Sequence, residues 1–138
     1  MTTTLVDSNV LLDIITEDPV WFGWSSEALQ EAADSSRVVI NVIVYAETSA
    51  RFSRIEEMDE MLERAGIVRA DIPFEAIFLA GKAFNAYRKR TGLKTSVLSD
   101  FFIGAHAAVG GFRLITRDAT RMKTYFPQIN IMSPKATN

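Results

Sequence analysis

Short β-favouring runs alternate with helical patterns along almost the whole chain. Apolar, β-branched runs predict strands at residues 2–6, 37–41, 67–69, 112–116 and 129–132. Between them, apolar residues recur every three or four positions and predict helices at residues 8–14, 20–34, 42–52, 53–65, 73–90, 100–109 and 119–125. Strands that alternate with helices form a parallel sheet covered on both faces. We therefore expect one α/β domain over residues 1–138, a three-layer α/β/α fold with a parallel five-stranded sheet, ending in a frayed tail at 133–138.

The same patterns predict helix caps and buried faces. Ser8 or Asn9 can cap the first helix, and Ser99 the helix at residues 100–109. Glu47 lies among apolar neighbours, which predicts a buried carboxylate that needs a partner. Trp21 recurs at helical spacing with its neighbours, which favours core packing over a partner contact. The apolar positions expected to be available for burial on the two long helices that follow are Ile55, Met58, Leu62, Ala65, Phe74, Ile77, Phe78, Phe84 and Tyr87.

Composition narrows the function classes. At 48% hydrophobic and 23% charged residues, the chain can bury a core and does not resemble a disordered segment. The absence of Cys excludes disulfides and thiolate metal sites, and the single His106 argues against a histidine-rich zinc site. We interpret His106 as a structural helix residue. The chain has no membrane-length apolar run and no signal-peptide pattern, so we expect a cytoplasmic protein without a membrane partner.

The net charge of −2 hides a strong division along the chain. Residues 1–81 hold 15 of the 17 acidic residues but only 5 of the 15 basic ones. Residues 82–138 hold the other 10 basic residues and only two acids, Asp100 and Asp118. A basic half favours a polyanionic partner such as nucleic acid. The basic residues at 88–90 end a helix, so they could complement its dipole, contact phosphates, or both.

Four carboxylates occupy positions from which they could converge. Asp7 and Asp118 follow predicted strands, Glu47 lies early in the helix after the second strand, and Asp100 opens an otherwise apolar helix. The carboxyl ends of parallel strands share one edge of the sheet, where ligands collect. Each acid also has a structural interpretation, as a turn residue, a cap or a complement to a helix dipole. Spacing alone leaves both interpretations open.

Clustered carboxylates repel one another unless a cation neutralises them. Oxygen-only ligands suit Mg²⁺ or Mn²⁺, which also bridge to substrate phosphates. Such an ion can activate a water and stabilise charge on a phosphodiester. Neither a Ser-His-Asp nor a Cys-His arrangement competes with this interpretation, because Cys is absent and His is single.

These residues resemble the PIN domain family, and more narrowly the VapC-type toxin ribonucleases of toxin–antitoxin pairs. The resemblance covers nearly the whole chain and depends on the order and spacing of its motifs. The matching segments are residues 6–12, Asn41 with 46–47, 99–108, 114–118 and 121–127. It implies a metal-dependent endoribonuclease whose four-carboxylate site is formed by Asp7, Glu47, Asp100 and Asp118. All four acids are present, so the sequence does not suggest an inactive enzyme.

The resemblance also implies supporting roles and partners. Thr116 would orient the fourth acid or a metal-bound water, and Asn9 would hold the carboxylate of Asp7. Family members usually form homodimers and are silenced by a cognate VapB-like antitoxin. An acidic site repels RNA, so nearby cations must contact the RNA backbone. The candidates are Lys89, Arg90, Lys94, Arg117, Arg121 and Lys123.

Two other interpretations compete with a ribonuclease. A receiver domain of signalling proteins is also α/β with an acidic pocket, but it needs paired acids after the first strand, where this chain offers only Asp7. A catalytically silent PIN-like binding module is the second alternative, and the intact set of acids argues against it.

Overall fold

Five parallel strands form the centre of the computed structural model, which describes residues 2–92 and 97–135. The sheet order is β3-β2-β1-β4-β5, so the first strand of the chain lies in the middle. All four strand pairs are parallel, and Leu5 of β1 aligns with Val39 of β2 and Leu114 of β4. The strands are β1 (Thr3–Val6), β2 (Arg37–Ile40), β3 (Ile67–Arg69), β4 (Arg113–Ile115) and β5 (Ile131–Met132).

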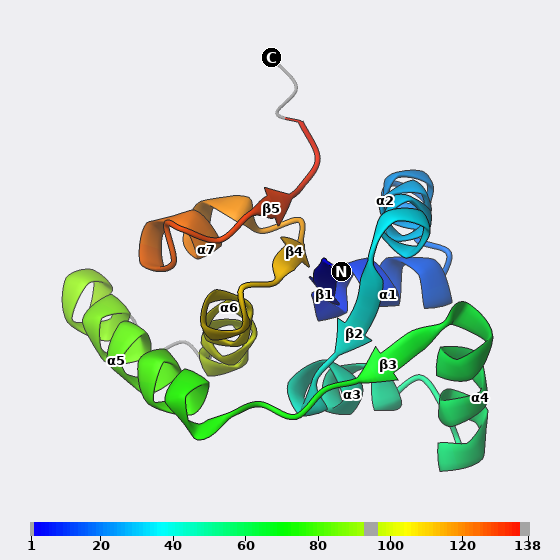
Figure 1. Ribbon diagram of the computed structural model, residues 1–138, viewed down its shortest axis with the longest axis horizontal. Coiled ribbons are helices and arrows are strands. Elements are labelled where there is room, and N and C mark those ends of the chain that lie inside the picture. The colour runs from blue at the N-terminus through cyan, green and yellow to red at the C-terminus, as the bar shows by residue number, and fades with distance from the viewer. Residues whose placement is uncertain (1, 93–96, 136–138) are drawn as a thin grey trace.

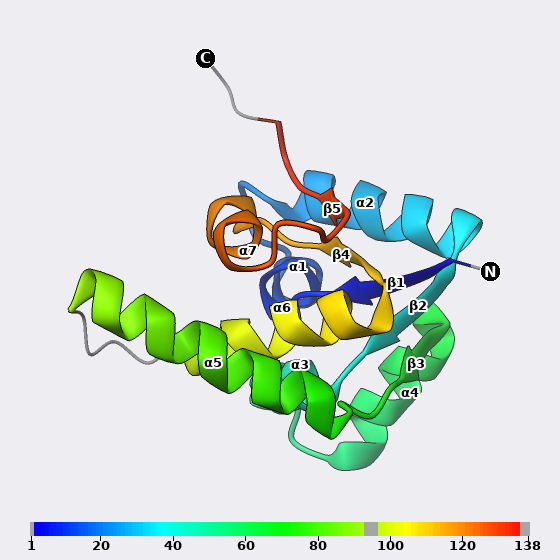
Figure 2. The same ribbon diagram turned by 60° about the vertical axis from the view of Figure 1, so that its left-hand side comes forward.

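Helices cover both faces of this sheet, which confirms the predicted three-layer α/β/α fold (Figure 1). Figure 2 shows α2 on one side of the sheet, with α5 and α6 packed together on the other. Among the described residues, no helix is both long and apolar enough to cross a membrane. The helices are α1 (Ser8–Ile15), α2 (Phe22–Ser35), α3 (Val42–Ser49), α4 (Ile55–Ala65), α5 (Phe74–Thr91), α6 (Leu98–Gly110) and α7 (Ala119–Tyr125).

The core follows the strands, as the apolar runs predict. Central strand β1 is buried from Thr4 to Val6, because a strand covered on both faces has no solvent side. On the outer face of α6, an aromatic cluster joins three helices: Phe101 packs against Tyr87 of α5 at a ring-centroid distance of 5.4 Å and against Tyr125 of α7 at 5.2 Å. Helices α5 and α7, which carry most of the basic residues of the second half of the chain, are thereby held together through α6.

Two predicted caps are wrong. Asp7, rather than Ser8 or Asn9, occupies the N-cap position of α1, because the chain leaves the strand one residue earlier. Helix α6 begins at Leu98 with Val97 at its N-cap, so Ser99 and Asp100 already lie in the first turn. An acidic side chain there stabilises the positive end of the helix dipole.

Several predicted burials are also wrong. Glu47 is exposed, and so are Val42 and Ala46 of the same helix. The apolar neighbours of Glu47 in the sequence therefore do not form one buried face around it. On α5, Phe74 and Phe78 are 84% and 68% exposed, because the face of this helix that is buried carries Ala76, Ala80 and Tyr87 instead. Ile55 and Ala65 at the two ends of α4 are exposed as well, whereas Met58 and Leu62 in its middle are buried as predicted. Of the remaining positions, Tyr87 is buried, and Ile77 and Phe84 are partly buried.

Candidate active site

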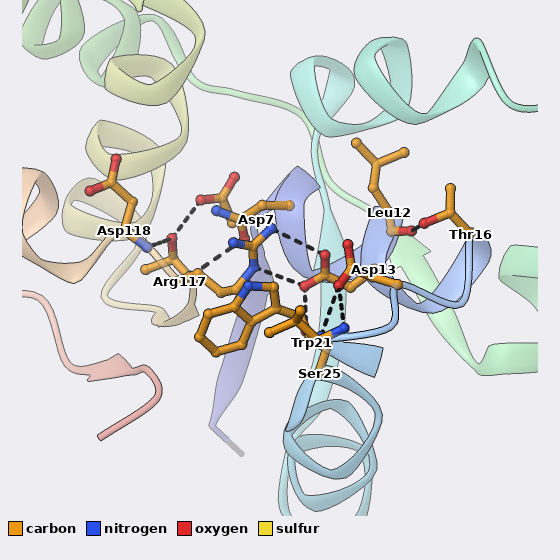
Figure 3. Close-up of polar contacts among 12 residues, drawn as sticks. Asp7, Leu12, Asp13, Thr16, Trp21, Ser25, Arg117 and Asp118 are labelled. Atoms are coloured by element: carbon orange, nitrogen blue, oxygen red, sulfur yellow. Dashed lines mark hydrogen bonds and ion pairs between the residues drawn. The ribbon is translucent and has the colours of Figure 1, made fainter. Parts of the chain in front are cut away.

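A buried carboxylate lies at the centre of the candidate site. Asp7 directly follows the central strand and is 4% exposed. The hydroxyl of Thr116, just beyond the neighbouring strand β4, donates a hydrogen bond of 2.6 Å to Oδ2 of Asp7. The same hydroxyl accepts the backbone N–H of Asp118 at 3.0 Å (Figure 3). One buried threonine therefore positions two of the predicted acids relative to each other.

The environment of Asp7 disfavours its charge. Burial raises the pKa of Asp7 from 3.8 to about 6, because the carboxylate loses its hydration. The hydrogen bond from Thr116 opposes this shift, whereas the negative charges of Asp100 and Glu47 add to it. Such mutual repulsion requires these carboxylates to lie within electrostatic range of one another.

The other three acids approach Asp7 from different elements. Glu47 of α3 accepts a hydrogen bond of 2.6 Å from the hydroxyl of Ser8, a residue that the sequence pattern predicts only as a helix cap. Asp100 of α6 pairs with Arg121 at 2.6 Å, and Asp118 pairs with the same guanidinium at 3.2 Å. Burial raises the pKa of Asp100, Arg121 lowers it, and the charges of Asp118 and Glu47 raise it further. The structure thus brings all four predicted acids to one edge of the sheet.

A second buried acid, Asp13, was missed by sequence reasoning. Its carboxylate is 4% exposed and accepts the Ser25 hydroxyl at 2.7 Å and two donors of Arg117 at 2.9 and 3.1 Å. Figure 3 shows the Arg117 guanidinium facing Asp13, and it lies 5.0 Å from the centroid of the Trp21 ring. The available signal was an acid inside an apolar helical run, which predicts a buried carboxylate with a distant cation.

Asn9 contacts a different partner from the one expected. Its side-chain oxygen accepts the backbone N–H of Arg117 at 3.4 Å, whereas Thr116 is the side chain that holds the carboxylate of Asp7. Asn9 and Asp13 therefore both contact Arg117, and together they attach the segment after β4 to α1. This segment carries Asp118, so its position depends on α1.

His106 is a structural residue, as predicted. It is buried, and its Nδ1 lies 3.2 Å from the side-chain nitrogen of Asn41. Asn41 also caps α3 by accepting the backbone N–H groups of Ile43 and Val44 at 3.0 Å each. Burial lowers the pKa of His106, and a hydrogen bond with the backbone of Asp71 opposes this. His106 thus ties α6 to the start of α3, the helix that carries Glu47.

The predicted RNA-binding cations differ in their surroundings. Lys89 and Lys123 are exposed, and Lys94 lies outside the described residues. Arg90 donates to the Tyr125 hydroxyl at 2.9 Å and stacks on that ring while remaining exposed. Arg117 and Arg121 are paired with carboxylates of the protein itself. The exposed cations therefore present more of their charge to solvent than the two paired arginines do.

The carboxylate oxygens of the four acids are of the kind that binds a hard divalent cation, although each carboxylate contacts another group of the protein. Within residues 2–92 and 97–135, no group of three or more Asp, Glu or His side chains is arranged to hold a metal ion. Each acid instead has an internal partner: hydroxyls for Asp7 and Glu47, and Arg121 for Asp100 and Asp118. The chemistry of the oxygens and the raised pKa of Asp7 nevertheless fit a site that a cation would stabilise.

A model of the PIN domain family matches residues 4–125, which is most of the chain. The chain belongs to the PIN domain family. The predicted family membership is therefore confirmed. A search of curated proteins gives no match.

Solved structures of low identity share the PIN fold of this chain. The VapBC2 structure from Rickettsia felis, bound to a promoter DNA fragment, has a TM-score of 0.69 at 19% identity, covering 96% of this chain and 98% of that one. DNA-bound VapBC from Salmonella typhimurium has a TM-score of 0.65 at 21% identity, with the same coverage. A toxin–antitoxin complex from Klebsiella pneumoniae has a TM-score of 0.64 at 21% identity, covering 97% and 99%.

The sheet order decides against the receiver interpretation. Receiver domains share the flavodoxin-like order 2-1-3-4-5. This PIN domain has the order β3-β2-β1-β4-β5, and the backbone of Asp71, the acid after the third strand, accepts a hydrogen bond from His106. The strand order of this chain therefore differs from that of a receiver domain.

Proposed function

We propose that this PIN domain is a Mg²⁺- or Mn²⁺-dependent endoribonuclease of the VapC toxin type. The observation that carries the proposal is the grouping of four carboxylates in a PIN domain: Asp100 and Glu47 lie within electrostatic range of buried Asp7, and Asp118 shares Arg121 with Asp100. Burial, with a smaller contribution from the charges of Asp100 and Glu47, raises the pKa of Asp7 to about 6, and a carboxylate so disfavoured is typical of a functional site. A bound divalent cation would neutralise these carboxylates and so offset the cost.

In this proposal, Asp7, Glu47, Asp100 and Asp118 hold the cation. The ion supplies an activated water and stabilises charge on the attacked phosphate. Thr116 holds Asp7 in its orientation through the 2.6 Å hydrogen bond, so that the carboxylate faces the other acids without rearrangement. Asn9 supports Asp118 indirectly, because its side-chain oxygen accepts the backbone N–H of the preceding residue, Arg117.

The substrate in this proposal is RNA held by its backbone. Lys89, Arg90 and Lys123 are exposed on α5 and α7, two helices joined by the aromatic cluster. Cations of this kind bind phosphates without reading sequence, so the choice of target depends on RNA shape and on single-stranded loops.

The partners proposed are a VapB-like antitoxin and a second copy of the chain. The structural relatives include toxin–antitoxin complexes, and Phe74 and Phe78 form an exposed apolar pair one turn apart on α5. Exposed large apolar side chains of this kind are typical of protein–protein contacts. Light scattering of the purified protein tests the dimer, and loss of RNA cleavage on co-purification with a candidate antitoxin tests the second partner.

Cleavage mapping tests the ribonuclease. Purified protein is incubated with transfer, ribosomal and messenger RNA, in Mg²⁺, in Mn²⁺ or in EDTA. We expect cut sites in either ion and none in EDTA. Asp7→Asn and Asp100→Asn should abolish cleavage, whereas Asp34→Asn, at an exposed acid on α2, should retain it. Persistent cleavage by Asp7→Asn would refute the site, and no cleavage by the wild type would favour a silent binding module.

A further inference from the structure

Arg121 lies within the acidic site, although it was expected to face RNA. Its Nη1 donates to Oδ2 of Asp100 at 2.6 Å and lies 3.2 Å from Oδ2 of Asp118. The side chain of Arg121 is only 28% exposed. A single positively charged nitrogen therefore bridges two carboxylates that come from different elements, α6 and the segment before α7.

The guanidinium is also held from a second side. Its central carbon lies 5.6 Å from the centroid of the Tyr87 ring, a distance at which an aromatic face attracts a cation. Tyr87 is buried and packs against Phe101 and Tyr125 at 5.4 and 5.9 Å. The ring is thus fixed, and it keeps Arg121 directed toward the acids rather than toward solvent.

The charges explain why a cation lies there. Among the ion pairs of the described residues, those made by the four predicted acids all involve Arg121. Within the described parts of the chain, Asp7 and Glu47 receive neutral donors: the Thr116 hydroxyl and the Ser8 backbone for Asp7, and the Ser8 hydroxyl for Glu47. Among the described residues no group of three acids is arranged around a metal, and the nitrogen of Arg121 lies between Asp100 and Asp118.

We propose that Arg121 is an internal counter-cation that competes with the divalent ion for Asp100 and Asp118. This inference rests on the proposed metal-dependent function. The guanidinium occupies the position between two carboxylates in which a divalent cation would be expected, so it must leave before the ion can bind both. Only molecules in which Arg121 has moved away can bind the ion through both carboxylates. The apparent metal affinity therefore falls in proportion to the fraction of such molecules. Removing Arg121 should tighten metal binding, the opposite of what removing a supporting residue would do.

Mn²⁺ titration of metal-free protein tests this competition without measuring RNA cleavage. The variants are Arg121→Gln and, to keep an unbranched chain over Tyr87, Arg121→Met. Both should bind Mn²⁺ at least about tenfold more tightly than the wild type, since no charge-assisted contact has to be broken first. Both should also melt at a lower temperature in EDTA, because Asp100 and Asp118 then repel each other. Addition of Mn²⁺ should raise their melting temperatures more than that of the wild type.

Lys123→Gln is the matched control, because it removes the same charge from an exposed position of the same helix. Its Mn²⁺ affinity should stay within about twofold of the wild type, as expected for a screened surface charge. Equal or weaker Mn²⁺ binding by both Arg121 variants would overturn the inference, and so would an equal gain in Lys123→Gln. Failure of every protein, wild type included, to bind Mn²⁺ would instead refute the proposed metal-dependent function.

Discussion

Asp7→Asn should stabilise the metal-free protein, even though it abolishes the proposed activity. Asp7 is 4% exposed and has no cation among its described contacts, so its charge opposes folding. Its pKa rises from 3.8 in the unfolded chain to about 6 in the folded one. At about 1.4 kcal/mol per unit, the ionised carboxylate lowers the free energy of unfolding by about 3 kcal/mol above pH 6.

The sign of the pH dependence follows from proton binding. Between pH 3.8 and about 6, the folded state holds a proton on Asp7 that the unfolded state has released. Asp7 therefore contributes a loss of stability as the pH rises through this window, and the loss is complete above it. Asparagine cannot ionise but can still accept the Thr116 hydroxyl, as a weaker neutral acceptor. The net gain for Asp7→Asn should be about 2 kcal/mol at pH 8 and close to zero at pH 4.

Asp13→Asn provides a matched comparison. Asp13 is equally buried, at 4% exposure, but it accepts two hydrogen bonds from Arg117. The same chemical change there removes a paired charge, so the free energy of unfolding should fall by about 1.5–3 kcal/mol. Two carboxylates of equal burial should thus respond with opposite signs.

Urea denaturation in EDTA at pH 4 and pH 8 measures both effects. The difference in free energy of unfolding between Asp7→Asn and the wild type, compared at the two pH values, separates the contribution of Asp7 from those of the other carboxylates. Saturating Mn²⁺ should reduce the advantage of Asp7→Asn, because a bound cation stabilises the wild type. An Asp7→Asn protein less stable than the wild type at pH 8, or a difference independent of pH, would refute the electrostatic account of the site.

Three further predictions concern residues around the site. Thr116→Val removes the donor that lowers the pKa of Asp7, so the acid limb of the cleavage pH profile should move upward by about one unit; an unmoved limb would exclude Asp7 as the group that titrates. Asn41→Ala removes both the cap of α3 and a contact of a buried histidine, which should lower the free energy of unfolding by about 2 kcal/mol in thermal or urea melts. Lys89→Gln and Lys123→Gln should each reduce the slope of log RNA affinity against log salt by about 1, and an unchanged slope would remove these lysines from the RNA interface.

Local sequence pattern determined the element types and the fold class. Strand and helix periodicities reflect which side of each element is apolar, and this can be read within a window of a few residues. Alternation of the two then restricts the chain to a parallel sheet with covered faces. Asp7 could be identified as a candidate for the same reason, because its place directly after a buried strand puts it at the edge where ligands collect.

Only the tertiary structure decided which charges meet. Asp13 and Arg117 lie 104 positions apart, and they pair because the sheet order places β4 beside β1. The exposure of Glu47 and Phe74 likewise depends on which helix face lies against a neighbour, and no local pattern contains that information. The sequence alone shows which types of residue follow the strands and so lie at the edge of the sheet. Their partners, and hence which cation neutralises Asp100 and Asp118, depend on long-range packing, because electrostatic energy is set by distances in space rather than by separation along the chain.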